Sequence, residues 1–172
     1  TPLGLLVVVC DGMGGGPSGK AASSTATDVI IQTVRSGKLS DSPLTVLQQA
    51  IKMANQALIS EIQKKPALRG MGTTVTALLI NEYSAIAAYV GDSRIYQFRR
   101  GHKKFRTFDH SMVFEMVRNG TINEEQARLS EQSNMITKAL GANSDIEADI
   151  VELPYEKGDR FMLCTDGIWG MF

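Results

Sequence analysis

The run Leu5-Leu6-Val7-Val8-Val9-Cys10 is followed directly by Asp11-Gly12-Met13-Gly14-Gly15-Gly16. A continuous apolar run of this length is typical of a buried strand. The glycines after it predict a turn, because glycine adopts backbone conformations that other residues avoid. We therefore expect Asp11 to stand at the end of a buried strand, beside a backbone that a ligand can approach closely.

Two further aspartates occupy similar places. Asp166 ends the run Phe161-Met162-Leu163-Cys164-Thr165 and precedes a glycine, and Asp92 lies in Gly91-Asp92-Ser93-Arg94, just after another apolar run. If such strand ends converge, their carboxylates repel one another, and a hard divalent cation such as Mg²⁺ or Mn²⁺ removes that cost. Asp-Gly is also an ordinary turn dipeptide, so the residues alone leave both interpretations open.

Two long helices are predicted after the glycine-rich turn. Ser18 is a candidate N-cap for a helix that runs to about Ser36, and Ser42 with Pro43 begins a second helix that ends before Pro66. The apolar positions of the second helix recur every three or four residues, which indicates one buried face. This stripe consists of Leu44, Leu47, Ile51, Ala54, Leu58 and Ile62.

The rest of the chain changes character. β-Branched and aromatic residues predict strands at 73–80, 85–90 and 94–98, which we interpret as an antiparallel meander. A helical region is predicted at 111–140 with a break at Gly120, and a final hairpin pairs 148–153 with 160–164. Helices and strands that occur in separate blocks favour an α+β fold over an alternating α/β fold.

Composition narrows the classes of function. The 172 residues include 18 Lys and Arg and 18 Asp and Glu, so the formal net charge is zero and neither nucleic acid nor a membrane is expected as a partner. No apolar run approaches the roughly 20 residues of a membrane-spanning helix. Cys10 and Cys164 lie inside apolar runs and predict free, buried thiols, which favours a cytoplasmic location.

A nucleotide hydrolase is one alternative. The segment from Gly14 to Lys20 follows a strand, opens a helix and nearly matches the phosphate-binding loop G-x-x-x-x-G-K-[ST]. However, Ala21 occupies the position where that loop needs a hydroxyl group for Mg²⁺, and the strand blocks do not alternate with helices as βαβ units require.

Taken in order, the motifs resemble those of the metal-dependent protein serine/threonine phosphatases of the PP2C type, and most closely the bacterial members. The resemblance spans nearly the whole chain. It is carried by Val9-Cys10-Asp11-Gly12-Met13-Gly14-Gly15, Gly19, Ala22-Ser23, Gly72-Thr73-Thr74, Val90-Gly91-Asp92-Ser93-Arg94, Asp109-His110-Ser111, Thr137-Lys138-Ala139-Leu140-Gly141, Gly158-Asp159 and Cys164-Thr165-Asp166-Gly167.

The resemblance implies a four-layer α/β/β/α sandwich of two antiparallel sheets flanked by helices. It also implies two Mn²⁺ or Mg²⁺ ions that activate a water for hydrolysis of phosphoserine and phosphothreonine in proteins. By position, Asp11 corresponds to a bridging carboxylate, Gly12 to a backbone-carbonyl ligand and Asp166 to another metal ligand. Asp92, together with Asp166, corresponds to the ligands of a weaker third metal, and residues 111–134 correspond to a variable flap that influences substrate choice.

Several positions depart from the family pattern. Gly16 stands where the family usually has a histidine, and Lys20 stands at a position that is commonly glutamate. An arginine and an acidic pair expected near the start, and an Asp-Asn motif expected near the end, lie outside residues 1–172. Gly16 and Lys20 favour an alternative in which the domain is a pseudophosphatase that binds or regulates a partner.

The family motifs that lie outside residues 1–172 lead to a further expectation: a single domain, residues 1–172, that lacks both ends of the family's fold. Such a domain would expose unpaired strand edges, so we expect it to associate with itself through them or to be marginally soluble. The partners implied by the resemblance are a phosphoprotein substrate and a cognate kinase or regulator.

Overall fold

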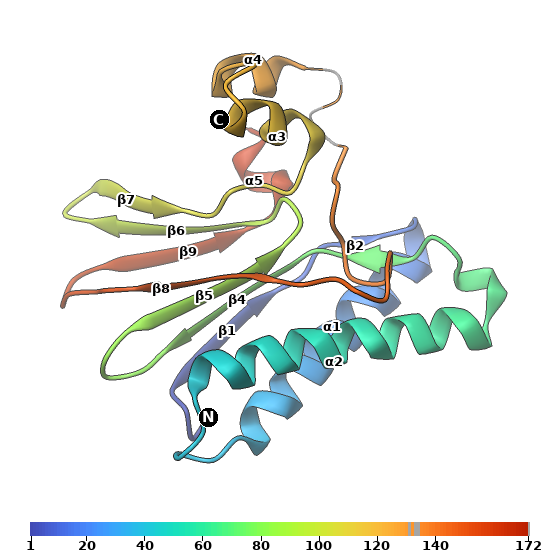
Figure 1. Cartoon of the computed structure of the whole chain (residues 1–172), viewed down its shortest axis with the longest axis horizontal. Helices are drawn as coiled ribbons and strands as arrows, with labels where there is room; N and C mark the ends of the chain where they lie inside the picture. Colours follow the sequence, from blue (N-terminus) through green and yellow to red (C-terminus); the bar gives the residue numbers. More distant parts are fainter. Residues whose placement is uncertain (131, 133–134, 172) are drawn as a thin grey trace.

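A computed structural model describes residues 1–130, 132 and 135–171, and it confirms a mixed α+β fold built on antiparallel sheets (Figure 1). The first sheet has the strand order β1-β4-β5-β8, and its strands are Leu5–Val9, Val75–Ile80, Ala85–Val90 and Asp149–Leu153. The second sheet has the order β7-β6-β9, with strands His102–Arg106, Arg94–Arg99 and Arg160–Cys164. A short third pairing joins β2, Gly12–Met13, to β3, Gly72–Thr73.

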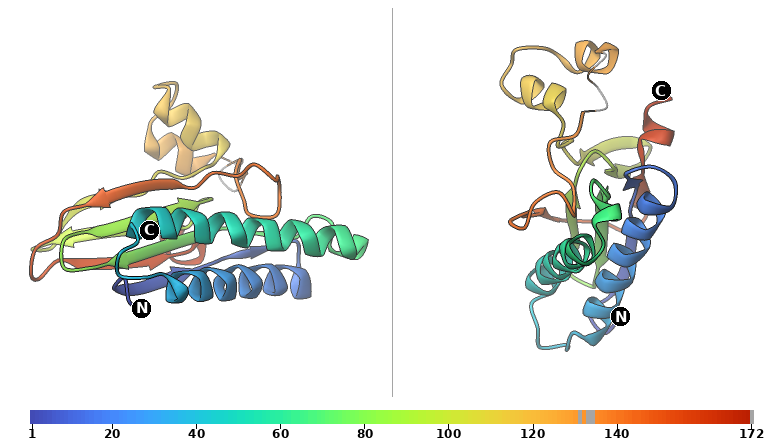
Figure 2. Two further views of the ribbon diagram at one scale, coloured as in Figure 1. Left: turned by 60° about the horizontal axis from the view of Figure 1, so that its bottom comes forward. Right: turned by 90° about the vertical axis from the view of Figure 1, so that its right-hand side faces the viewer.

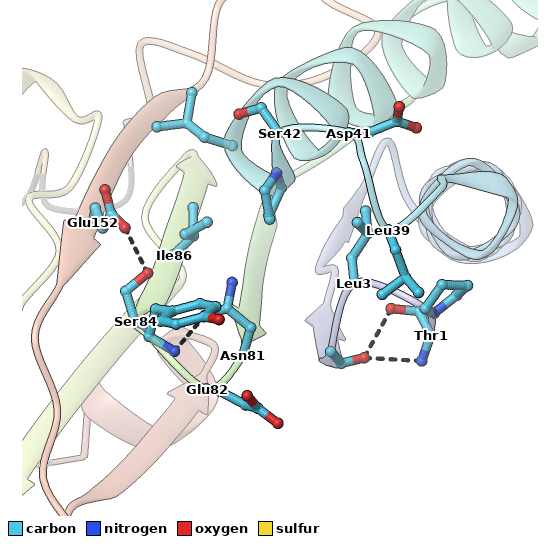
Figure 3. A pocket seen from close by; sticks show the side chains of 15 residues that line it. Thr1, Leu3, Leu39, Asp41, Ser42, Asn81, Glu82, Ser84, Ile86 and Glu152 are labelled. Carbon is cyan, nitrogen blue, oxygen red and sulfur yellow. Dashed lines mark hydrogen bonds between the residues drawn. The ribbon is translucent and has the colours of Figure 1, made fainter.

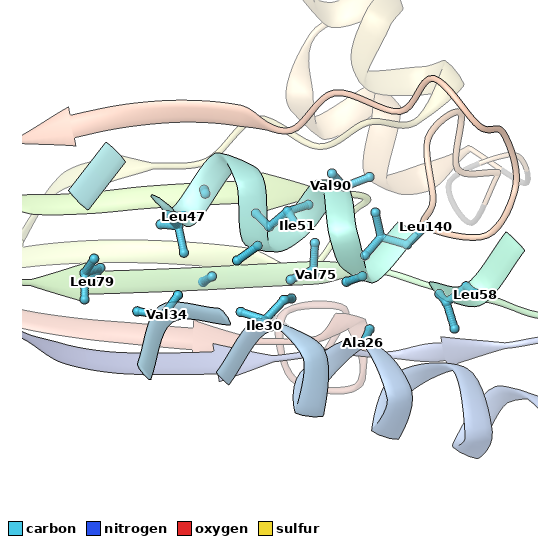
Figure 4. Packing of buried hydrophobic residues seen from close by; sticks show 14 of the residues in the cluster. Ala26, Ile30, Val34, Leu47, Ile51, Leu58, Val75, Leu79, Val90 and Leu140 are labelled. Carbon is cyan, nitrogen blue, oxygen red and sulfur yellow. The ribbon is translucent and has the colours of Figure 1, made fainter. Parts of the chain in front are cut away.

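Two long helices cover one face of the first sheet. They are α1, Gly16–Ser36, and α2, Pro43–Lys64, and Figure 2 shows them side by side along the sheet. Their buried side chains meet alternate residues of β4 and β5, so that the main core lies between helices and sheet (Figure 4). The cluster includes Ala26, Ile30, Val34, Leu47, Ile51, Leu58, Val75, Leu79 and Val90.

The opposite face of the first sheet packs against the second sheet. Because side chains alternate along a strand, the residues of β4 and β5 that point away from the helices form a second core with β6 and β8. Its buried members are Leu78, Ala85, Ala87, Ile95 and Leu153. The two sheets and the helical pair α1–α2 therefore form successive layers (Figure 2).

The helix boundaries were predicted well with two corrections. Ser42 accepts a hydrogen bond from the backbone of Thr45 and begins α2 as expected. Ser18 does not cap α1, because the helix already begins at Gly16 after Gly15, whose positive φ of 75° turns the chain into it. Leu44 was assigned to the buried stripe of α2, but it is 36% exposed. It lies in the first turn of α2, where the helix only begins to cover the sheet.

The predicted meander is wrong at its last step. β4 and β5 pair as expected, but β6 leaves the first sheet and begins the second. The crossing occurs at Gly91, whose φ of 104° and close approach to Thr74 leave no room for a side chain. β7 was not predicted as a strand; it forms a hairpin with β6.

The predicted hairpin of 148–153 with 160–164 is also wrong, since β8 and β9 belong to different sheets. β8 pairs with β5, and Ser84 donates a hydrogen bond to Glu152 at that edge. β9 pairs with β6, and Asp159 accepts hydrogen bonds from Gln97 and Arg99. These contacts between distant segments outweigh the local turn.

The region 111–140 is helical only in its first part. Helix α3 is Met112–Arg118 and α4 is Glu124–Leu129, and Gly120 separates them as predicted. Residues 131 and 133–134 lie outside the described residues. Ile136 and Leu140 form bridges to Ser111 and Thr73, so this stretch is held as extended chain. No helix in the described ranges combines the length and apolar content needed to cross a membrane.

Candidate metal centre

The three aspartates singled out by the sequence all stand at ends of strands. Asp11 follows β1, Asp92 follows β5, and Asp166 follows β9 and opens the short helix α5, Asp166–Trp169. Thr74 joins the first two positions, because its hydroxyl accepts a hydrogen bond from the backbone N–H of Asp11 at 3.0 Å. The same hydroxyl is hydrogen-bonded to the hydroxyl of Ser93 at 2.7 Å.

The backbone of Asp11 is held at its carbonyl as well. The N–H of Thr74 and the hydroxyl of Thr73 each donate to the Asp11 carbonyl oxygen at 2.9 Å. Both threonines are buried, so these hydrogen bonds are protected from water and fix the peptide next to the carboxylate. The carboxylate of Asp11 is therefore attached to a rigid backbone, which a preorganised ligand requires.

The Asp92 turn is held by His110 from the other side. The backbone N–H of His110 donates to the carbonyl of Gly91 at 2.9 Å, and the N–H of Gly91 donates to Nδ1 of His110 at 3.0 Å. Nε2 of His110 faces Asp149 at 3.3 Å. His110 is buried, and the neighbouring Ser111 caps α3.

The carboxylates perturb one another electrostatically. Burial raises the pKa of Asp11, and the negative charge of Asp166 raises it further. Burial also raises the pKa of Asp92, to about 6, and the charges of Asp166, Asp109 and Asp11 act in the same direction. The structure thus brings the three predicted aspartates close enough to disfavour a fully ionised cluster.

Gly12 is the fourth predicted site residue and lies between β1 and the start of α1. A Cβ atom on Gly12 would stand 1.9 Å from the carbonyl oxygen of Gly19, so only glycine fits between the strand and the helix. Gly12 also pairs with Thr73 in the β2–β3 ladder. The Gly12 peptide follows Asp11 directly in the chain, and the close packing against Gly19 holds it there.

This donor set suits a hard divalent cation, because carboxylate and carbonyl oxygens are the ligands that Mg²⁺ and Mn²⁺ prefer. A bound divalent cation would neutralise the negative charge of the Asp92 and Asp166 carboxylates. Within the part of the chain that the structure describes, no group of three or more His, Cys, Asp and Glu side chains has a geometry ready to enclose a metal ion.

The nucleotide-hydrolase alternative does not fit the topology. Every strand pairing described is antiparallel, and β1 lies at the edge of its sheet. A phosphate-binding loop of the type considered joins a strand of a parallel sheet to a helix. Lys20 lies inside α1, whose first residue is Gly16.

A cavity of about 740 Å³ lies at the opposite end of the first sheet (Figure 3). It is formed by the turn before β1, the connection between α1 and α2 and the turn between β4 and β5. Two of its carboxylates are already engaged, because Asp41 accepts from the N–H of Lys38 and Glu152 accepts from Ser84. None of the three strand-end aspartates lines this cavity.

Comparison with known proteins gives the class. Residues 2–172 match the family Protein phosphatase 2C. A putative protein phosphatase 2C-type from Streptococcus pyogenes is 39% identical over 168 residues, which cover 96% of this chain and 68% of the relative. The serine/threonine phosphatase Stp of Listeria innocua is 32% identical over 169 residues, covering 96% of this chain and 67% of the relative.

Solved structures agree with this relationship. The serine/threonine phosphatase Stp1 from Staphylococcus aureus superimposes with a TM-score of 0.89 at 32% identity, over 97% of this chain and 66% of that one. The catalytic domain of PstP, determined with two manganese ions, has a TM-score of 0.81 at 31% identity, over 95% and 67% of the two chains. The chain therefore belongs to the protein phosphatase 2C family.

The raised pKa of Asp92 leads to a prediction about stability. A carboxyl with a raised pKa in the folded state binds its proton more tightly there, so stability falls as pH rises from about 4 to about 6. Without metal at pH 7, Asp92→Asn should stabilise the fold by roughly 1–2 kcal/mol, after allowance for solvent screening. Thermal unfolding in a chelator at pH 7 and pH 5 measures this, and the gain should shrink at pH 5.

Asp145→Asn is the matched control, because this aspartate is exposed and should show little change at either pH. A destabilising effect of Asp92→Asn at pH 7 would contradict the placement of Asp92 among like charges.

Proposed function

We propose that this chain hydrolyses phosphoserine and phosphothreonine in phosphoprotein substrates, using Mn²⁺ or Mg²⁺. The observation that carries the proposal is the convergence of Asp11, Asp92 and Asp166 at strand ends, on a chain of the protein phosphatase 2C family. The manganese ions of the related PstP catalytic domain support the choice of cation. We further propose that residues 1–172 belong to one phosphatase domain, since β4 and β5 of the first sheet contribute side chains to both hydrophobic cores.

The proposed roles follow the geometry of the site. Asp11, the backbone carbonyl of Gly12 and Asp166 would hold the principal cations, and Asp92 with Asp166 would hold a further one. Bound cations of this kind lower the pKa of a water nucleophile and neutralise phosphoryl oxygens. The hydrogen bonds from Thr73 and Thr74 hold the backbone carbonyl of Asp11 in a fixed place, so the residue that carries the carboxylate has a rigid main chain. The absence of a disulfide between the free Cys10 and Cys164 is compatible with our proposal that the protein acts in the cytoplasm.

The enzymatic test uses a phosphothreonine peptide and measures phosphate release with added Mn²⁺. We expect activity that a chelator abolishes and that Asp11→Asn and Asp166→Asn each reduce by at least about 100-fold, because each removes a charged ligand. Asp145→Asn should leave the rate unchanged. A rate that is indifferent to Mn²⁺ would contradict the proposal.

The pseudophosphatase remains the second candidate, and Gly16 is the specific observation that favours it. A side chain at this position would meet open space, and the φ of 43° is a left-handed conformation that favours glycine. The position therefore supplies no acid group of the kind that the family's usual histidine would provide. Saturable Mn²⁺ binding without phosphate release would identify this alternative, because the metal site would then be present and turnover absent.

We also propose that the chain associates with itself through its sheet edges. β1 is an outer strand of the first sheet, and its Leu5 and Val7 are 63% and 37% exposed. β9 is an outer strand of the second sheet and exposes Met162 by 39%. Exposed apolar side chains on an outer strand favour pairing with another chain.

Light scattering coupled to size-exclusion chromatography tests this association. We expect a dimer at high concentration that Leu5→Lys converts to monomer, since a charge on an outer strand opposes edge pairing. Leu39→Lys is the control, because Leu39 is 85% exposed and lies in the connection between α1 and α2. A monomer at every concentration would contradict the proposal.

A further inference from the structure

The single tryptophan of the chain contacts the candidate metal centre through the backbone. Trp169 is the last residue of α5, and its indole Nε1 donates a hydrogen bond to the backbone carbonyl of Asp92 at 3.0 Å. The first residue of the same helix is Asp166. Residues three apart lie close together on a helical turn, so Trp169 lies near Asp166 within α5. Helix α5 therefore contains Asp166 and, through Trp169, contacts the backbone of Asp92.

A buried arginine stacks on one face of the indole ring. The guanidinium of Arg94 lies 3.6 Å from the centre of the Trp169 ring, a cation–π contact, and Arg94 is only 4% exposed. Asp109 accepts two hydrogen bonds from this guanidinium, at 2.8 and 2.6 Å. The planar arginine is thus fixed in orientation, and the tryptophan that stacks on it has little freedom to tilt.

The same arginine connects this arrangement to the helical pair α3–α4. Phe114 of α3 lies 5.2 Å from the Arg94 guanidinium, so the arginine contacts aromatic rings of two separate elements. Figure 1 shows α3 and α5 beyond the same end of the second sheet. The orientation of Trp169 therefore depends on segments that are distant in sequence.

We infer that Trp169 is a positioning residue that keeps the carboxylates of Asp92 and Asp166 in a fixed mutual arrangement for a shared divalent cation. This inference rests on the proposed function. The carbonyl of Asp92 is held by the indole, and the preceding Gly91 peptide is held by His110. Two like-charged carboxylates would separate if the turn were free, because each raises the energy of the other. The indole hydrogen bond opposes that separation.

The substitution that isolates this hydrogen bond is Trp169→Phe. Phenylalanine retains an aromatic face for Arg94 and removes the Nε1 donor, although its single ring is smaller than the indole. Groups that orient metal ligands from outside typically change metal affinity by about 10–100-fold when they are lost. We expect Trp169→Phe to weaken Mn²⁺ binding at the weakest site by about tenfold and to leave the tighter binding at Asp11 unchanged. Calorimetric titration with Mn²⁺ resolves the two classes of site.

A second measurement needs no change at Trp169. Mn²⁺ is paramagnetic and quenches nearby indole fluorescence, and the chain has a single tryptophan, so all indole emission comes from Trp169 beside the candidate metal centre. We expect saturable quenching by Mn²⁺ in the unaltered chain, with a weaker-binding phase that Asp92→Asn removes and a tighter phase that it leaves. Tyr83→Phe, at an 88% exposed residue far from the site, is the control for both measurements.

The outcomes separate this inference from the proposed function. If the unaltered chain binds no Mn²⁺, both are contradicted. If the chain binds Mn²⁺ and Asp92→Asn weakens the binding, but Trp169→Phe binds as tightly as the unaltered chain, only the positioning role is overturned. If Trp169→Phe fails to fold, the fluorescence titration decides, and emission unaffected by saturating Mn²⁺ would overturn the inference.

Discussion

The Thr74 hydroxyl is the interaction on which the site depends. It accepts a hydrogen bond from the backbone of Asp11 and is hydrogen-bonded to Ser93, so it joins the turn after β1 to the turn after β5. Thr74 lies between β3 and β4, directly before the start of an inner strand of the first sheet. The buried hydrogen bonds place two acidic turns side by side, and they do so without relying on any attraction between the acidic side chains themselves.

The rest of the fold supplies the rigidity that this arrangement requires. Burial of carboxylates and the crowding of like charges both destabilise a protein, and in this order they raise the pKa values of Asp11 and Asp92. The helical core on one face of the first sheet and the second sheet on the other hold the strand ends in place. Such a site is less stable empty than occupied, so a bound cation should stabilise the whole domain.

The sequence predicted the local features of this structure and missed the long-range ones. The apolar run before Asp11 and the Ser42-Pro43 helix start were readable because both depend on residues within a few positions of each other. The ordered motifs also identified the family, which supplied the two-sheet architecture. By contrast, the assignment of β6 and β9 to a separate sheet depends on pairing between residues far apart, such as Arg94 with Cys164.

The supporting residues of the site were missed for the same reason. Asp11, Asp92 and Asp166 could be proposed because each follows or ends an apolar run, and Gly12 was proposed from the family resemblance alone. His110 and Trp169 act on the Gly91–Asp92 turn from 19 and 77 residues away, and neither has a local pattern that indicates its partner. The one available signal was the Asp109-His110-Ser111 motif of the family, which marks the position without stating the contact.

The central claim is that Asp11 and Asp166 converge on a common divalent cation. Calorimetric titration of Mn²⁺ into the unaltered chain, Asp11→Asn and Asp166→Asn tests it most directly. We expect saturable Mn²⁺ binding to the unaltered chain that both substitutions weaken, because each removes one of the carboxylates that share the ion. Binding that is absent, or that is equally tight in both variants, would contradict it.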